Sequence, residues 1–141
     1  MSKRKTLISR LGFRTSGLAK TLGMTLVSLG KNSVKGRMPW TKRASQWNGL
    51  IHGGALAALA DTTAGVGTIH VIGPGWRILT AEMKINFFGN IPNGSVDADG
   101  KLLHRGSRSM VWEVRLTPTG KKKLLAISII TYIILDPKHR E

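Results

Sequence analysis

Two short features of this chain can support chemistry, the run His52-Gly53-Gly54 and the acid Asp61 nine positions after the histidine. Asp61 is the first acidic residue of the chain and lies in the small, apolar stretch GGALAALADTTAGVG. A carboxylate in such surroundings is unfavourable unless it is paired, hydrogen-bonded or used in a reaction. Asp61 is therefore a candidate catalytic group, with a structural cap or a pair with one of the many arginines as the alternative.

The stretch from His52 to about Thr68 predicts one helix, because alanine and leucine are strong helix formers. We expect this helix to end on Gly65 and Gly67. At its start, the N–H groups of Gly53 and Gly54 would have no partner within the helix and would lie at the positive end of its dipole. Bare amides of this kind form a ready oxyanion site.

Gly53 and Asp61 are too far apart on one helix to act on the same atom. At a rise of 1.5 Å per residue, the eight-residue separation corresponds to about 12 Å. A reacting carbonyl must lie about 3 Å from both groups. Two antiparallel copies of the helix can meet this requirement, because each presents its start beside the other's acid. The spacing therefore predicts at least a homodimer with its sites at the interface.

The remaining segments predict strands. Residues 24–40 contain two short segments around the turn Gly30-Lys31-Asn32, and everything after the helix reads as β structure. Residues 124–135 are apolar on both faces, so we expect this strand to be central and covered on both sides. The predicted class is α+β, with one long helix and five to six mostly antiparallel strands. Residues 76–88 alternate between two sets, Leu79, Ala81, Met83, Ile85 and Phe87 against Thr80, Glu82, Lys84 and Asn86.

The length and the net charge of the chain limit the classes of function that it can have. The chain has 141 residues, which suits one domain, and its 22 Lys and Arg against 7 Asp and Glu give a formal charge of +15. Such a charge favours phosphate-bearing or other polyanionic partners.

There are no cysteines, which excludes disulfides and cysteine-based sites. The four histidines lack metal-ligand spacing, so we expect no metal. No apolar run approaches roughly 18 residues, so we expect a soluble protein.

Residues 1–19 form a basic segment without acids, followed by a single domain over residues 20–141. We expect this segment to be a flexible extension or a targeting peptide, since its composition also suits a mitochondrial transit peptide. The expected location is the cytoplasm, with the mitochondrial matrix as the alternative. The basic segment is also a candidate for contact with an anionic membrane surface.

The stretch GLIHGGALAALADTTAG resembles the helix signature of the hotdog-fold acyl-CoA thioesterases, specifically the phenylacetate-pathway type. In that group, the motif Gly-x-x-His-Gly-Gly is followed by an acidic residue, which lies nine positions after the histidine. The resemblance runs from about Leu22 to Leu135 and includes the strand LTAEMKINFFGNIPNG. It implies a sheet wrapped around a long central helix, homodimers and often homotetramers, hydrolysis of an acyl-CoA thioester and no cofactor.

The same resemblance assigns roles to individual residues. Asp61 takes the general-base or nucleophile role, and the Gly53 N–H binds the thioester oxygen. His52 supports the oxyanion end, and Thr80 replaces a hydroxyl residue that positions water. The family often has asparagine six residues before the histidine, where this chain has Gln46, whose side chain is longer.

Further residues are candidates for binding substrate. Arg105, Arg108 and the run Lys121 to Lys123 could bind the phosphates of coenzyme A, although the lysines could equally keep a hairpin tip solvated. The acyl pocket is expected between subunits. The candidates near it are Asn48, Gly54, Leu56, Leu59, Met83 and Phe87.

Other functions compete with this interpretation. A non-catalytic basic protein could bind nucleic acid or anionic lipid, but the chain has little of the aromatic and basic interleaving that stacking platforms use, so nucleic acid is disfavoured. The same fold could instead act on acyl-carrier-protein thioesters or as a hydratase. No Gly-x-Ser-x-Gly motif or phosphate-binding loop is present.

Overall fold

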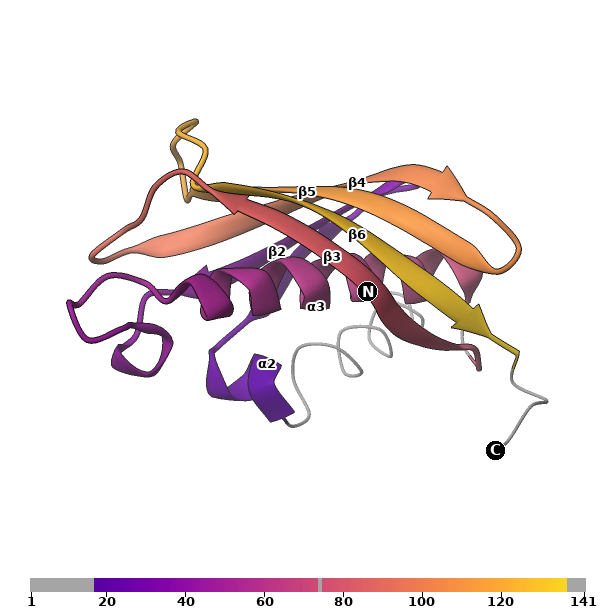
Figure 1. Ribbon diagram of the computed structural model, residues 1–141, viewed down its shortest axis with the longest axis horizontal. Helices are drawn as coiled ribbons and strands as arrows, with labels where there is room; N and C mark the ends of the chain where they lie inside the picture. Colours follow the sequence, from indigo (N-terminus) through magenta and orange to yellow (C-terminus); the bar gives the residue numbers. More distant parts are fainter. Residues whose placement is uncertain (1–16, 74, 137–141) are drawn as a thin grey trace.

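The computed structural model describes residues 17–73 and 75–136 (Figure 1). Six strands form one antiparallel sheet in the order β1-β2-β4-β5-β6-β3, and the helix α3 lies across one face of it. This arrangement confirms the predicted α+β class. The elements in chain order are α2 (Gly17–Thr21), β1 (Thr25–Leu29), β2 (Ser33–Pro39), the 3-10 helix η2 (Lys42–Ala44), α3 (Gly53–Ile72), β3 (Arg77–Phe87), β4 (Ser95–Arg105), β5 (Ser109–Pro118) and β6 (Ala126–Leu135).

The helix α3 runs one turn further than predicted and ends at Gly73, which has a positive φ of 93°. The prediction that it ends on Gly65 and Gly67 was wrong, because Gly67 serves packing. A Cβ atom at Gly67 would lie 2.8 Å from both the Trp112 ring and the Val34 side chain. Only a residue without a side chain lets the helix approach the sheet this closely.

By length and composition, α3 could cross a membrane, with 20 residues and a mean hydropathy of 1.4. This corrects the expectation that no stretch reaches such a size. The inward side chains of the helix, such as Leu56, Leu59 and Val66, are buried in the core together with Trp112 and Ile130 of the sheet. A helix apolar on every face is typical of a core position as well as of a membrane span.

One buried hydrogen-bond chain ties α3 to the sheet. Trp112 of β5 donates from Nε1 to Thr68 Oγ1 at 2.9 Å, and the Thr68 hydroxyl donates to the main-chain oxygen of Ala64 at 2.9 Å. Because both polar side chains are satisfied, they can be buried without a large penalty.

The strand β3 contains a bulge at Ala81, between the register pairs Thr80–Tyr132 and Glu82–Thr131. The extra residue changes the alternation that the sequence predicts, because residues on either side of a bulge no longer follow one period of two. Thr80 therefore shares the helix-facing side of the strand with Met83, whereas Leu79 is on the outer face and 57% exposed. The predicted alternation is wrong before Ala81 and correct after it.

The strand β6 is interior in the sheet, as predicted, with β5 on one side and β3 on the other. Its helix-facing side is buried, but the expectation that both faces are covered was wrong within the described chain. Ile129 and Ile133 are 36% and 43% exposed on the outer face, where Figure 1 shows no described element.

Most of the predicted N-terminal extension, residues 1–16, lies outside the described residues. Residues 17–19 begin the short helix α2, and the side chains of Ala19 and Leu22 are buried in the core. The described part of this segment is therefore packed onto the domain.

Candidate active site

The start of α3 is capped by its own histidine. His52 has an extended backbone, and its Nδ1 atom accepts a hydrogen bond from the Gly54 N–H at 2.7 Å. Gly54 is therefore not a free donor, contrary to the prediction. The Gly53 N–H has no partner among the described residues, and it points out of the positive end of the helix. A neutral His52 ring must then carry its proton on Nε2, which provides a second donor at this end.

The loop before α3 is folded as a tight hairpin, closed by the pair Ser45–Ile51. The backbone of Gln46 belongs to the hairpin, with its N–H bonded to the Leu50 oxygen at 2.9 Å. The Asn48 side chain accepts from the Leu50 N–H at 3.2 Å, so it stabilises the turn. Trp47 at the tip is 94% exposed. The loop therefore places Gln46 and Asn48 before the helix start, but no described contact joins either side chain to Gly53 or Asp61.

Asp61 lies in the middle of α3 and is held by two hydroxyl groups. Thr80 of β3 donates from Oγ1 to Asp61 Oδ1 at 2.8 Å. The Tyr132 hydroxyl of β6 lies 2.8 Å from the same Oδ1 atom and 2.6 Å from the Asp61 main-chain oxygen. Asp61 Oδ2 has no hydrogen-bond partner among the described residues. The structure thus places Thr80, expected from the resemblance to position water, in direct contact with Asp61, and one carboxylate oxygen has no partner among the described residues.

Tyr132 was missed by the sequence analysis. Burial raises the pKa of its hydroxyl far above the usual range, and the charge of Asp61 and the hydrogen bond to it raise this pKa further. Tyr132 therefore remains protonated near neutral pH, and its hydroxyl can donate a hydrogen bond. A signal was present in the sequence, because it is the only tyrosine of the chain and stands in a strand of aliphatic residues.

The expected pocket residues separate into two groups. The ring of Phe87 lies against Gly53, where an added Cβ atom would contact it at 3.4 Å. Met83 is partly buried on the same side of β3. Leu56 and Leu59 are 1% and 0% exposed and belong to the core, so the structure does not support the expectation that they line an accessible pocket.

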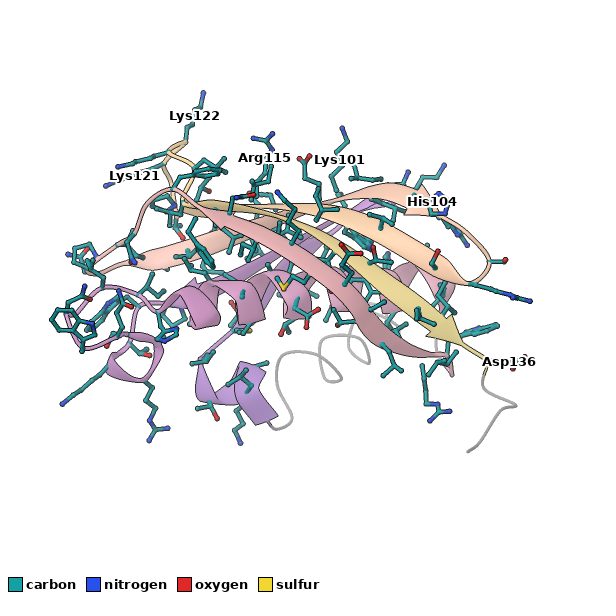
Figure 2. All side chains as sticks on the ribbon, in the orientation of Figure 1. Lys101, His104, Arg115, Lys121, Lys122 and Asp136 are labelled. Atoms are coloured by element: carbon teal, nitrogen blue, oxygen red, sulfur yellow. The ribbon has the colours of Figure 1, made fainter. Side chains whose placement is uncertain are left out.

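The expected phosphate-binding cations do not gather at one place on the chain. Lys121 and Lys122 lie at the tip of the loop between β5 and β6, at the opposite end of the sheet from His104 and Asp136 (Figure 2). Arg105 and Arg108 flank the turn between β4 and β5, close to His104. A single subunit therefore cannot use all of them on one ligand. Within the described chain, no group of three His, Asp or Glu side chains could hold a metal ion.

Comparison with known proteins identifies the family of the chain. The family model of the thioesterase superfamily matches residues 48–124, more than half of the chain. A 1,4-dihydroxy-2-naphthoyl-CoA hydrolase of Listeria monocytogenes is 30% identical over 118 residues, which cover 84% of this chain and 95% of the relative.

Solved structures show the same fold. A conserved protein of Pseudomonas aeruginosa superposes with a TM-score of 0.79 at 32% identity, covering 85% of this chain and 94% of the other. A phenylacetic acid degradation protein of Thermus thermophilus superposes with a TM-score of 0.72 at 22% identity, covering 81% and 95%. Together with the sequence matches, this likeness shows that the chain belongs to the thioesterase superfamily, has the hotdog fold and is a thioester hydrolase.

Proposed function

We propose that the protein hydrolyses acyl-CoA thioesters as a homodimer, in which each active site combines Asp61 of one subunit with the partner subunit's Gly53. The proposal rests on the hydrogen bonding of two groups on α3, the carboxylate of Asp61 and the N–H of Gly53. Among the described residues, one carboxylate oxygen of Asp61 and the N–H of Gly53, at the positive end of the helix, have no hydrogen-bond partner. Each group is suited to one half of a thioester reaction, and one helix separates them by about 12 Å.

The edge strand β3 offers a way to bring the two halves together. It is an edge of the sheet, 11 residues long, and such an edge readily pairs with a second strand. On its helix-facing side, Thr80 contacts Asp61, and Phe87 lies against Gly53. An antiparallel pair of β3 strands about a two-fold axis near Lys84 would place the partner's Phe87 beside Thr80. The partner's Gly53 would then lie beside Asp61.

The proposed chemistry uses both groups on one carbonyl. The thioester oxygen accepts from the partner's Gly53 N–H and from the partner's His52, and the helix dipole stabilises the negative charge that develops on it. Asp61 Oδ2 takes the proton of a water molecule that attacks the carbonyl carbon. In the alternative route, Oδ2 attacks the carbonyl itself, and water then hydrolyses the resulting anhydride. In both routes the C–S bond breaks, and one water is consumed to give a free acid and coenzyme A.

The positive charges have a role in this arrangement. Coenzyme A carries a diphosphate and a 3′-phosphate, which lysine and arginine bind well. In an antiparallel dimer, the Lys121 end of one subunit lies beside the Arg105 and Arg108 end of the other. The cations that a single chain keeps apart would then flank the same cleft. The outer face of the sheet, with Ile129 and Ile133 exposed, is a candidate surface for assembly of two dimers into a tetramer.

The first experiment is a panel of acyl-CoA thioesters, with release of free thiol as the readout. Wild type should hydrolyse at least one member, and Asp61→Ala should lower kcat by several orders of magnitude. The absence of hydrolysis by the wild type, combined with salt-sensitive binding to nucleic acid or anionic vesicles, would overturn the catalytic proposal.

A complementation experiment tests the shared site. Gly53→Pro removes the N–H donor and should keep the fold, because proline suits the first position of a helix and the extended backbone of His52 suits the residue before it. The added Cβ atom would lie at ordinary contact distance from Phe87, so Gly53→Ala, which keeps the N–H, is the matched control. Asp61→Asn and Gly53→Pro should each be nearly inactive alone. A co-expressed mixture should recover about a quarter of the wild-type activity, since half the dimers are mixed and each mixed dimer has one intact site. A mixture as inactive as the single variants would place both groups in one subunit.

A further inference from the structure

We propose that Tyr132 is a positioning residue that holds Asp61 by Oδ1 and so leaves Oδ2 as the oxygen that reacts. This inference rests on the proposed function, because it concerns how the same carboxylate is made ready. Thr80 and Tyr132 both point to Oδ1, whereas Oδ2 has no partner among the described residues.

The two donors differ in exposure, and this difference gives them different roles. Thr80 is exposed, so its hydroxyl can leave Oδ1 and bind a water molecule or substrate during the reaction. Tyr132 is 2% exposed, and its ring belongs to the core cluster. It cannot turn away from Asp61 without opening the core. We therefore assign the permanent contact to Tyr132.

The Tyr132 hydroxyl lies within hydrogen-bond distance of both the backbone and the side chain of Asp61. Its oxygen is 2.6 Å from the Asp61 main-chain oxygen and 2.8 Å from Oδ1. The single phenolic proton favours the carboxylate, because a charged acceptor forms the stronger hydrogen bond. A rotation of the Asp61 side chain would lose this bond, so the carboxylate is held with Oδ2 away from β6.

Among the described residues, no positively charged side chain competes with Tyr132 for the Asp61 carboxylate. The strands β3 and β6 bring only Thr80 and Tyr132 to Asp61, and within residues 17–73 and 75–136 no lysine, arginine or histidine lies within ion-pair distance of this carboxylate. Among the described residues, Asp61 is therefore held by these two hydroxyl donors alone. Removal of the Tyr132 hydroxyl would leave the exposed Thr80 as the single donor to the carboxylate.

The test is Tyr132→Phe, which keeps the ring and removes the hydroxyl. We expect kcat to fall about tenfold with KM nearly unchanged, because the reacting oxygen loses its orientation while substrate contacts remain. We also expect the acidic limb of the pH–kcat profile to move to higher pH, since the ionised carboxylate has lost a donor. An unchanged kcat and an unchanged acidic limb would overturn the proposal.

The matched control is Thr68→Val. It removes a hydrogen bond of the same kind, from the buried Trp112 ring to α3, without contact to Asp61. This variant should lower the melting temperature as Tyr132→Phe does, but it should leave kcat and the acidic limb unchanged. A shift of the acidic limb in both variants would show that loosening of α3 is the cause, and would overturn the specific role of Tyr132.

A readout without substrate separates this inference from the proposed function. The carboxyl carbon of Asp61 can be followed by NMR during a pH titration of the folded protein. If no acyl-CoA is hydrolysed by the wild type but Tyr132→Phe still moves this titration to higher pH, the proposed function fails and the contact stands. If the wild type is active and the titration is the same in both proteins, the assignment to Tyr132 fails and the proposed function stands.

Discussion

Asp61 and Asp97 are two carboxylates in one sheet-and-helix domain, and their surroundings differ in one decisive respect. Both oxygens of Asp97 are engaged: Arg37 donates from Nε to Oδ1 at 2.6 Å and from Nη2 to Oδ2 at 3.1 Å, and Thr119 donates to Oδ1 at 2.9 Å. From the part of the chain that the structure describes, Asp61 receives only neutral hydroxyl donors, and both of them act on one oxygen. A carboxylate saturated by an arginine is built for stability, and one with a free oxygen is available for reaction.

The charged groups around Asp97 keep this carboxylate ionised. Burial works to raise the pKa of Asp97, but the hydrogen bonds from Arg37 and Thr119 and the positive charges of Arg37 and Lys35 outweigh it, so the pKa is held below its usual value. This acid remains ionised to low pH and cannot serve as a proton acceptor near neutrality. Asp97 and Asp61 therefore differ in whether both carboxylate oxygens have hydrogen-bond partners among the described residues. This difference, rather than burial, separates a carboxylate that stabilises the fold from one that is available for reaction.

The largest effect is expected from Asp61→Asn. The amide retains an oxygen for Thr80 and Tyr132 but cannot accept a proton or attack a carbonyl. We expect kcat to fall by about 10³-fold or more, with a melting temperature equal to or above that of wild type. Thiol-release kinetics and thermal melting check this. A variant that retains more than a tenth of the wild-type kcat would remove Asp61 from the reaction.

A smaller effect is expected from Thr80→Val, which removes the exposed donor and keeps the shape of the side chain. We expect kcat to fall about tenfold, because Asp61 and the attacking water are less well oriented. Thr80→Ser retains the hydroxyl and should recover most of the activity in the same assay. Equal activity of the valine and serine variants would show that the hydroxyl has no role.

The change Asp97→Asn should act on stability and spare catalysis. We expect the melting temperature to fall by about 5 °C at pH 7, because Arg37 loses its charged partner, while kcat of the folded enzyme is unchanged. The pH dependence has a definite sign. Because the folded-state pKa of Asp97 is lowered, its contribution is fully present above the unfolded-state value of about 3.9 and is lost as the pH falls through the folded-state value. The difference between the two melting temperatures should therefore shrink as the pH falls through the folded-state value, and a constant difference would contradict the assignment.

The smallest effect is expected from Lys35→Ala, which removes the pair between Lys35 and Asp99. The two groups are 3.2 Å apart, and their side chains are 36% and 47% exposed. An exposed pair of this kind contributes about 0–1 kcal/mol and less at high salt. Chemical denaturation at low and high salt measures it. A loss comparable to that of Asp97→Asn would show that exposure does not separate the two pairs.

The sequence predicted the elements well where a simple period governs them. The small residues around His52 and Asp61 predicted the central helix, and alternation predicted the strands. The bulge at Ala81 could not be predicted, because an inserted residue leaves no signal in a period of two. That bulge decides which residues share a face with Thr80.

Only part of the candidate site could be predicted, because several of its contacts join residues from different elements. The resemblance to a family pointed to Asp61 and Thr80 as site residues, and the hydrogen bond between them is seen only in the structure. The capping of Gly54 by His52 and the contact from Tyr132 depend on side-chain geometry across elements, which a linear pattern does not encode. The burial of Leu56 likewise depends on which side of the helix meets the sheet.

The tip of the hairpin before α3 has a practical consequence for spectroscopy. Trp47 is almost wholly in water, and Trp112 is sealed in the interior. The chain has two further tryptophans, Trp40 and Trp76. In a variant in which both are replaced by phenylalanine, the fluorescence of Trp47 and Trp112 should separate by emission wavelength and by access to a dissolved quencher such as acrylamide. A compound that covers the hairpin tip would then change the signal of the outer indole and leave that of the inner one untouched, so occupancy of this loop could be followed with no dye attached.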